Sequence, residues 1–212
     1  MNRKRVIFAK KYKSLSPKQW DNVLFSDESI FQASVSEGGR RVRRIRGQGR
    51  YEEKYTKRTI KNPPSQMIWT SFSSLGTGEI YFLKPGQRMT AILFTEVVLS
   101  HLIPTMKKLK VSSFIQDNAT CHTAKKSRDI LKKNIKTVYL PPSSPDLNPI
   151  ENAFAILKSK IENEDIKTLP KLRTAIRKIW KSMNKKHLSN LARSMPKRLR
   201  RVLELGGAMT EY

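Results

Sequence analysis

The chain has 212 residues, and its 43 lysines and arginines against 17 aspartates and glutamates give a formal net charge of +26. A charge this large calls for a polyanionic partner, with nucleic acid as the first candidate and a membrane surface as the second. No apolar run approaches the roughly 18 residues of a membrane span, and the single cysteine, Cys121, excludes an internal disulfide. The composition therefore indicates an intracellular nucleic-acid-binding domain, with or without an extension, and no membrane partner.

The first predicted strand covers residues 23–32, an apolar run with an acid pair in its middle. An acid buried in a strand is costly unless it is paired or binds a metal, so Asp27 has both a structural and a functional interpretation. Alternation puts Asp27 and Glu28 on opposite faces of the strand. The two acids therefore cannot face one site, and we interpret Glu28 as a structural or supporting residue. Before this strand, residues 1–22 are basic and predict a lead-in helix or linker.

Residues 37–61 form a segment rich in arginine and glycine, which we call the basic arm. Its composition is typical of an arm or hairpin that lies on phosphates, and the alternative is a solvated surface loop. Surface loops usually mix charges of both signs, which favours the first interpretation. The predicted DNA-binding residues of the arm are Arg40, Arg41, Arg43, Arg44, Arg46, Arg50 and Lys54.

The remaining pattern alternates strands with helices. Two apolar runs around a Gly-containing turn predict a β-hairpin, and Thr90 opens a helix that Pro104 kinks or ends. This order of elements predicts an α/β sheet protein. The expected hairpin strands are 67–73 and 79–83, the later strands 111–116 and 136–140, and the later helices 124–134, 148–163, 168–183 and a pair within 188–205.

Two further acids stand at the ends of predicted elements. Asp117 follows the strand 111–116, and Glu151 lies in the first turn of a predicted helix. Carboxylate oxygens without a cysteine or histidine cluster suit magnesium or manganese rather than zinc. Glu151 also has a local interpretation, because Asn148 as N-cap, a following proline and Glu151 at the third position form a capping box. For the neighbouring Asp146 we expect a turn-forming role.

Short motifs surround these acids. They read Leu-Phe-Ser-Asp-Glu-Ser at residues 24–29, Gln-Asp-Asn-Ala with His-Thr-Ala within 116–124, and Ser-Pro-Asp-Leu-Asn-Pro-Ile-Glu-Asn at 144–152. Met-Ile-Trp at 67–69 and Ser-Met-Pro-Lys-Arg at 194–198 add to them. On these motifs, nearly the whole chain resembles the Tc/mariner superfamily of cut-and-paste DNA transposases.

The resemblance implies a fold for the whole chain. It predicts an α/β protein with a ribonuclease-H-like core, a mixed five-stranded sheet flanked by helices. The catalytic domain would cover residues 23–212, with the basic arm as an insertion and extra C-terminal helices over 165–212. The chain departs from the family in having no counterpart of its paired helix-turn-helix modules, and in one residue fewer between Asp117 and Glu151 than many Tc-type members have.

The resemblance also implies the chemistry. The catalytic residues and metal ligands would be Asp27, Asp117 and Glu151, holding two Mg²⁺ or Mn²⁺ ions for DNA cleavage and strand transfer. The middle of a strand is a rigid position, so Asp27 would bridge the two ions. The alternatives are an inactive or domesticated core that acts as a DNA-binding module, and a ribonuclease-H-type nuclease acting on RNA–DNA hybrids.

The implied partner is double-stranded DNA, both transposon ends and a TA target, bound by a homodimer in the nucleus. Two residues outside the basic arm are further predicted DNA contacts. His122 follows Asp117 by five positions and would touch phosphate or steady the site, and a role in the loop or helix start stays open. Lys158 lies seven positions after Glu151 on the same helix face, where it would hold the DNA backbone.

Overall fold

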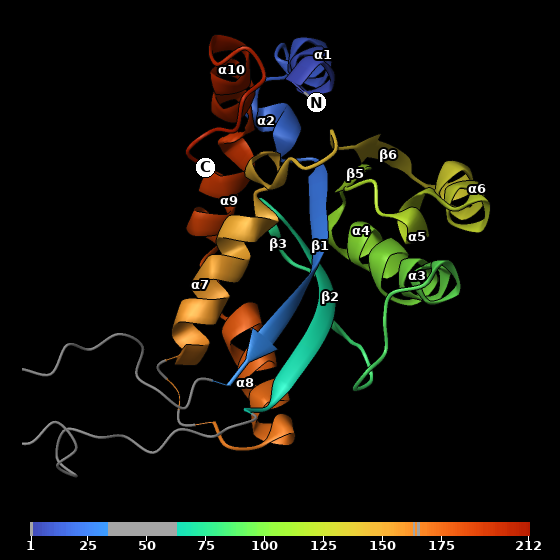
Figure 1. Cartoon of the computed structure of the whole chain (residues 1–212), viewed down its shortest axis with the longest axis vertical. Helices are drawn as coiled ribbons and strands as arrows, with labels where there is room; N and C mark the ends of the chain where they lie inside the picture. The colour runs from blue at the N-terminus through green and yellow to red at the C-terminus, as the bar shows by residue number, and fades with distance from the viewer. Residues whose placement is uncertain (1, 34–62, 163, 165) are drawn as a thin grey trace, which may run out of the picture.

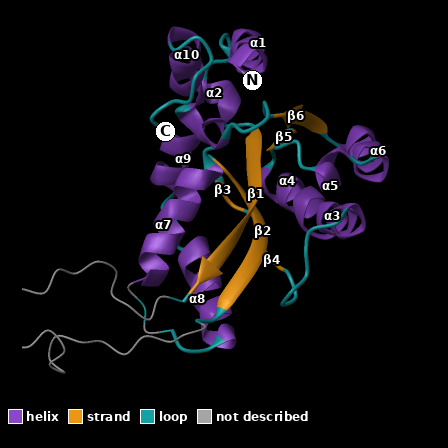
Figure 2. Ribbon diagram, in the orientation of Figure 1, coloured by secondary structure: helices purple, strands orange, loops and turns teal. Residues whose placement is uncertain are grey.

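A mixed β-sheet separates two layers of helices in the computed structural model, which describes residues 2–33, 63–162, 164 and 166–212 (Figures 1 and 2). The strand order is β3-β2-β1-β5-β6, with β4 also paired to β2. Strand β2 runs antiparallel to β1, whereas β5 and β6 run parallel to it. The strands are β1 (Val23–Gln32), β2 (Ser65–Ser73), β3 (Gly76–Thr77), β4 (Tyr81–Phe82), β5 (Ser113–Gln116) and β6 (Lys136–Tyr139).

The helices follow the predicted pattern closely. Thr90 caps the helix that it was expected to open, its hydroxyl accepting from the backbone N–H of Leu93 at 3.2 Å. The helices are α1 (Asn2–Tyr12), α2 (Pro17–Trp20), α3 (Ala91–Val97), α4 (Ile103–Leu109), α5 (Thr120–Thr123), α6 (Lys125–Asn134), α7 (Ile150–Glu162), α8 (Leu169–Lys181), α9 (Lys185–Arg193) and α10 (Met195–Glu204). A short π-helix, Val98–Leu102, joins α3 to α4, and a 3₁₀-helix, Pro145–Leu147, precedes α7.

Two predictions change in detail. The described sheet has six strands rather than five, because a two-residue strand, β3, pairs with β2 within the predicted turn, while β4 lies within the expected second arm, residues 79–83. Side chains bind the carbonyls between β3 and β4: Gly78 O accepts from the indole N–H of Trp180 at 3.1 Å, and Glu79 O from the hydroxyl of Thr70, on β2, at 3.1 Å. Pro104 does not end its helix. The π-helix just before it accommodates the missing backbone N–H of the proline, and the chain continues as α4.

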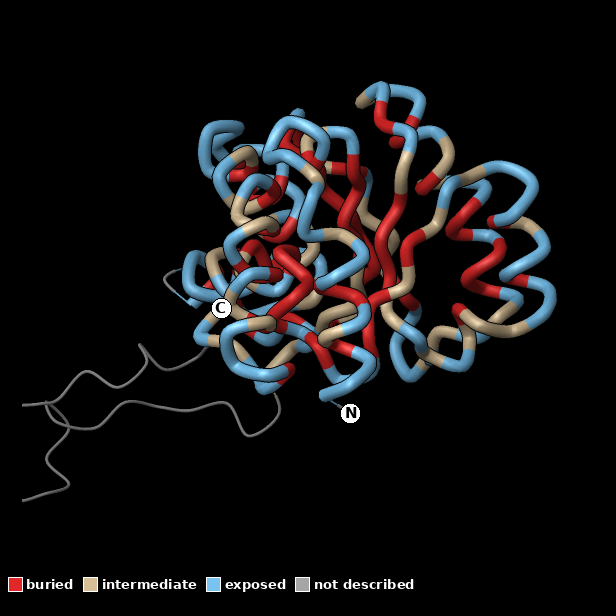
Figure 3. Tube along the Cα trace, turned by 90° about the horizontal axis from the view of Figure 1, so that it is seen from above, coloured by how far each residue is buried: buried red, intermediate tan, exposed pale blue. Residues whose placement is uncertain are grey.

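The alternation of β1 assigns each of its side chains to one of two cores. Val23 and Phe25 pack in a large core with α7 to α10, whereas Leu24 packs in a smaller core with α3 and β5. Figure 3 shows the buried residues along the strands and on the inner sides of the helices. Asp27 therefore projects on the α7 side of the sheet and Glu28 on the α3 side, as the sequence predicts.

A cluster of buried polar groups joins the two ends of the chain to the loop before α7. The guanidinium of Arg5 donates to both carboxylate oxygens of Asp146, at 2.8 and 2.6 Å, and to the carbonyls of Gly207 and Ala208. The backbone N–H and hydroxyl of Thr210 donate to Asp146 as well, at 3.0 and 2.9 Å. We call this set the Asp146 clamp.

The clamp changes the interpretation of Asp146, which was expected to form a local turn. Its carboxylate instead accepts hydrogen bonds from residues distant in sequence, and it is 2% exposed. A second buried arginine, Arg198, donates to the Asp146 carbonyl at 2.6 Å and to the side chain of Asn152 at 2.6 Å. Burial alone would raise the pKa of Asp146, but the hydrogen bonds from Arg5 and Thr210 hold its pKa below the usual value.

We expect Asp146→Asn to lower the free energy of unfolding by about 3–5 kcal/mol, because Arg5 then stays buried without its counter-charge. Urea denaturation at pH 7 measures the loss. In the wild type this stabilisation is present above the unfolded carboxyl pKa near 4, and it is lost as pH falls through the lower pKa of the folded state. The Asn variant should lack that acid-dependent loss.

Arg193→Ala is the matched control, because Arg193 also binds an aspartate, Asp21, through two nitrogens at 3.0 and 2.7 Å. The Arg193 side chain is 52% exposed, so water screens its charge and solvates both partners after the change. We expect a much smaller loss of stability. Equal losses in the two variants would contradict the importance of the Asp146 clamp.

Candidate active site

The three predicted acids come together at one pocket of about 410 Å³. Asp27 comes from the middle of β1, Asp117 directly follows β5, and Glu151 lies in the first turn of α7. Residues 140–145, which contain three prolines, also line this pocket. Three elements far apart in sequence thus present carboxylates to one space.

Asp27 is the most deeply placed of the three carboxylates. Its Oδ1 accepts from the backbone N–H of Glu28 at 2.8 Å, and its Oδ2 accepts from the amide of Asn148 at 3.0 Å. Burial raises the pKa of Asp27 to about 8, and the negative charges of Glu28, Glu151 and Asp117 add to the effect. Negative charge on Asp27 is therefore unfavourable in the protein alone.

Asp117 is held by a histidine that spans two acids. The Nδ1 of His122 lies 2.6 Å from Asp117 Oδ1, and its Nε2 lies 3.1 Å from Glu28 Oε1. Both partners are carboxylates, so the ring makes both hydrogen bonds only when it is protonated. Burial opposes that charge, but the bonds to Asp117 and Glu28 help raise the pKa of His122 to about 12.

Asp117 remains open to the pocket despite this contact. Its side chain is 47% exposed, and its Oδ1 also accepts from the backbone N–H of Ala119 at 3.0 Å. Burial alone would raise the pKa of Asp117, but the hydrogen bonds from His122 and Ala119 hold it below the usual value. His122 lies against the ring of Phe94, 4.3 Å between centroids, so a packed side chain positions the acid.

The predicted capping box at the start of α7 is wrong. The side-chain amide of Asn148 donates across to the Ser26 carbonyl at 3.1 Å and to Asp27, while its Oδ1 has no hydrogen-bond partner in the described chain. Asn148 thus binds β1 instead of capping the helix. Glu151 is left exposed at the pocket, where burial raises its pKa and the charge of Lys158 partly offsets the rise.

The donors at this pocket fit a hard divalent cation. The three carboxylates and the unpartnered Oδ1 of Asn148 are all oxygen atoms, which suits Mg²⁺ or Mn²⁺. Within the described residues, no three His, Cys, Asp or Glu side chains are gathered closely enough to form a ready-made metal site. Mg²⁺ commonly takes one or two carboxylates and completes its octahedron with water and substrate phosphate, so the arrangement is compatible with it.

The predicted DNA contacts are only partly placed. The basic-arm residues Arg40 to Lys54 lie outside the described residues. Lys158 lies on α7, with its Nζ 5.7 Å from the ring centroid of Phe31 and its charge acting on Glu151. His122 is 2% exposed and faces two carboxylates, which favours the positioning of Asp117 over contact with phosphate. DNA binding by Lys158 and by His122 stays a prediction.

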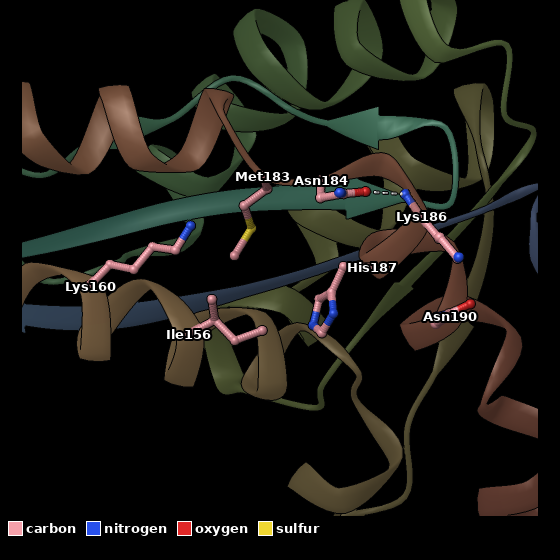
Figure 4. Close-up of a pocket in the computed structure, with 7 residues that line it drawn as sticks. All are labelled: Ile156, Lys160, Met183, Asn184, Lys186, His187 and Asn190. Carbon is pink, nitrogen blue, oxygen red and sulfur yellow. Dashed lines mark hydrogen bonds between the residues drawn. The ribbon is translucent and has the colours of Figure 1, made fainter.

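A second pocket, of about 430 Å³, lies between α7 and α9 (Figure 4). Ile156 and Lys160 come from α7, and Lys186, His187 and Asn190 from α9. No carboxylate lines it, so it lacks the hard oxygen donors of the first pocket. The first pocket, although slightly smaller, is therefore the candidate active site.

Sequence reasoning missed the groups that hold the acids in place. Asn148 fits a helix cap by its spacing, and only the fold shows β1 within its reach. Arg5 and Arg198 look like members of a generally basic surface, yet each is 1% exposed. A signal was present for both, because Arg5 shares a helical face with Phe8 and Ala9, and Arg198 shares one with Met195 and Val202, all of them buried.

Comparison with known proteins gives one matching family model. Residues 22–173 match the model described as DDE superfamily endonuclease. The Tc3 transposase of Caenorhabditis elegans is 32% identical over 214 residues, covering 99% of this chain and 63% of that protein. The Tcb1 transposase of Caenorhabditis briggsae is 28% identical over 216 residues, covering 100% of this chain and 78% of that protein. The chain thus spans less than two thirds of the Tc3 protein.

Solved structures share the fold. A Mos1 transposase paired-end complex with left transposon end superposes with a TM-score of 0.83 at 19% identity, over 99% of this chain and 62% of that chain. The Mos1 transposase catalytic domain with raltegravir and Mg gives a TM-score of 0.73 at 17% identity, over 99% of this chain and 94% of that chain. These similarities confirm the predicted ribonuclease-H-like α/β fold.

Replacing Asp27, the most deeply placed of the three acids, should stabilise the metal-free protein. We expect Asp27→Asn to raise the free energy of unfolding by on the order of 2 kcal/mol at pH 7, because the folded carboxyl has a raised pKa. The unfolded Asp27 ionises near pH 4 and the folded one near 8, so wild-type stability should fall across this range. Thermal denaturation in EDTA from pH 4 to 9 tests this.

Asp129→Asn, on the exposed side of α6, provides the matched control and should leave the pH profile unchanged. Added Mn²⁺ should stabilise the wild type and have little effect on Asp27→Asn, because the bound cation offsets the crowded negative charge. A lower melting temperature for Asp27→Asn than for the wild type in EDTA would contradict the interpretation.

Proposed function

The chain belongs to the DDE superfamily endonuclease family, in the Tc/mariner branch, and from that premise we propose that it cleaves DNA and transfers the freed strand. The reaction is the cut-and-paste movement of a DNA segment. Water first cleaves a phosphodiester bond and leaves a 3′-hydroxyl, and that hydroxyl then attacks a target phosphodiester, so each step exchanges one P–O bond for another. The catalytic domain is residues 23–212, and 1–22 lead into it.

One observation carries the proposal: Asp27, Asp117 and Glu151 line the same pocket. A strand, a strand end and a helix end bring three carboxylates together, and the pKa of Asp27 is raised by burial first and, to a lesser degree, by the negative charges of Glu28, Glu151 and Asp117. A protein that only bound DNA would gain nothing from this repulsion beside a polyanion. Catalysis with bound cations explains why the three acids are close together, because proteins keep destabilising arrangements where their function needs them.

We propose that the pocket takes two divalent ions, Mg²⁺ or Mn²⁺. When bound, they supply positive charge at the attacking and leaving oxygens of an in-line displacement at phosphorus. Asp27, in the middle of β1, would contact both ions, and Asp117 and Glu151 would each contact one.

The chain's own residues hold this arrangement rigid. Asn148 fixes one oxygen of Asp27, and the Glu28 N–H fixes the other. His122 holds Asp117 through its ring, leaving the carboxylate open to the pocket. The proline-containing wall confines the scissile phosphate, and restricting approach to one orientation is a large part of catalysis by positioning.

The proposed partner is double-stranded DNA, at transposon ends and at a TA target. Lys158 beside Glu151 and the arginines of the basic arm supply the phosphate contacts, in keeping with the net charge of +26. A homodimer working in the nucleus completes the proposal. None of the helices in the described ranges has the length and apolar character to cross a membrane.

The alternative, an inactive core retained as a DNA-binding module, makes a different prediction for the same acids. In such a module the three carboxylates would only weaken DNA binding, and their neutralisation would strengthen it. Metal-dependent cleavage separates the two possibilities.

Neutral replacement of each acid should abolish strand cleavage. We expect Asp27→Asn, Asp117→Asn and Glu151→Gln each to reduce nicking of supercoiled plasmid in Mn²⁺ by at least about 10³-fold, because each removes a ligand charge at the reacting phosphate. Gel assays of nicking, and of the joining of a pre-cut 3′-hydroxyl end to plasmid, measure both steps.

Glu162→Gln serves as the matched control, since Glu162 is an exposed acid at the other end of the same helix α7. It should retain wild-type rates. If the three variants nick DNA as fast as this control, or the wild type shows no metal-dependent cleavage, the catalytic proposal fails. Parallel assays on an RNA–DNA hybrid test the ribonuclease alternative.

Asn148→Ala should weaken metal use more than substrate binding. The change frees Asp27 Oδ2 from its hydrogen bond, so we expect a rise of about 10-fold in the Mn²⁺ concentration for half-maximal nicking. DNA affinity without metal should stay within about 2-fold of the wild type, since the amide lies beneath the pocket, 1% exposed. An unchanged Mn²⁺ requirement would show that Asn148 only joins α7 to β1.

A further inference from the structure

A groove of about 340 Å³ runs beside the candidate active site, between α1 and the chain that leaves β6. One side of α1 forms its first wall, and Tyr139 with residues 140–142 forms the second. Residues 140–142 also line the carboxylate pocket. The two hollows therefore lie on either side of one short turn, and we call the second the α1 groove.

Charge divides sharply across this turn. The carboxylate pocket is lined by three acids and no lysine or arginine, whereas the α1 groove is lined by Lys4 and Lys11 and no acid. The whole of α1 contains no aspartate or glutamate. A polyanion that placed one phosphate among cations in the carboxylate pocket would meet lysines in the next hollow. The charge pattern thus suits a chain of phosphates that crosses the turn.

The floor of the α1 groove is apolar and aromatic. Tyr12 and Tyr139 line it, and the ring of Tyr12 lies 4.7 Å from that of Phe8. Ile7, on the same helix, also lines the groove and is 56% exposed. Aromatic surface between cationic side chains is the usual binding surface for unpaired nucleotides, whose base faces are free to stack. A base-paired duplex hides those faces, so the floor favours a single strand.

The spacing of the lysines fits such a strand. Lys4 and Lys11 are two helical turns apart on α1, a rise of about 10 Å along the helix axis. A stacked strand advances about 3.4 Å per nucleotide, so the two side chains span about three nucleotide steps. This length matches a short unpaired segment next to a single reacting phosphodiester.

We propose that the α1 groove binds an unpaired DNA segment of about three nucleotides, continuous with the phosphodiester in the carboxylate pocket. Lys4 and Lys11 neutralise its phosphates, and Tyr12 and Tyr139 contact its bases. The proposal deepens the DNA-cleaving function and rests on it. In physical terms, the aromatic floor compensates the stacking that the bases lose when the strand separates from its complement.

The first test is binding to fluorescein-labelled oligonucleotides in EDTA, so that cleavage plays no part. The probes are a blunt duplex and the same duplex with a three-nucleotide extension, on either the 5′ or the 3′ end. The wild type should prefer one extended duplex to the blunt one. Lys4→Ala/Lys11→Ala should lose about 25-fold in affinity for that probe at 0.1 M salt and reduce the slope of log K against log salt by about 1.4, since each single-strand phosphate contact contributes about 0.7.

Lys171→Ala/Lys178→Ala is the matched control. Both lysines are exposed on α8 with the same seven-residue spacing, so the variant loses equal charge far from the groove in sequence. It should keep the preference for the extended duplex, even if overall affinity falls. The proposal is overturned if neither extension improves wild-type binding, or if the groove and control variants keep the preference equally.

A second test locates the strand. Extensions carrying 5-iododeoxyuridine are irradiated in the complex, and the cross-linked peptides are mapped by mass spectrometry. Adducts on Tyr12 or Tyr139 support the proposal, and adducts confined to other residues overturn it. Sedimentation of the Lys4→Ala/Lys11→Ala variant addresses a different occupant: if the wild type dimerises and this variant is monomeric, the groove binds a second copy of the chain and the proposal fails.

These outcomes are separate from those that test the catalytic function. If the Asp27, Asp117 and Glu151 variants lose nicking but the wild type shows no preference for extended DNA, the catalytic function is supported and the proposal for the α1 groove fails. If the strand preference depends on Lys4 and Lys11 but the protein shows no metal-dependent cleavage, the groove proposal is supported and the catalytic function fails.

Discussion

The ion pair between Arg5 and Asp146 is the constraint on which the active-site geometry depends. Asp146 is followed at two positions by Asn148, which orients Asp27, and at five by Glu151. Fixing one buried carboxylate therefore fixes the register of the whole segment against β1. A buried ion pair adds little net stability over an apolar replacement, because desolvation offsets much of the attraction. Its value here is that it permits one position of the loop.

That rigidity explains how the protein tolerates its own acidic pocket. Without the clamp, repulsion among Asp27, Asp117 and Glu151 could be relieved by moving α7 away from the sheet. Arg198 opposes this movement from the other side by holding the Asp146 carbonyl and Asn152. The contacts of Arg5 and Arg198 thus hold the loop and α7 in place against the repulsion among the three acids.

The sequence predicted the frame of the molecule well. Residues 23–32 form the expected strand, and its alternation correctly separates Asp27 from Glu28, because strand periodicity is local physics. The sixth strand, β3, was missed because it is only two residues long and lies in the Gly-containing turn, where the pattern predicts no strand. The cap predicted for Asn148 was wrong for another reason: a distant acceptor on β1 competes successfully with the nearby backbone.

The convergence of the three acids could be expected only through motif resemblance. Neither spacing nor periodicity states that the end of β5 and the start of α7 meet beside the middle of β1. The role of His122 shows the same limit, since its contacts to Asp117 and Glu28 join residues from α5, the end of β5 and β1. Contacts of this kind form only when distant segments pack together, so local sequence patterns do not predict them.

The Asp146 clamp also sets an order of events during synthesis. Arg5 is made 202 and 203 residues before its partners Gly207 and Ala208, and Asp146 further requires Thr210. A chain growing at about 5–20 residues per second therefore waits some ten seconds or more before the loop can be fixed. Until residues 207–210 have left the ribosome, the nascent polypeptide has its three acids but not the clamp that holds the loop between them in place.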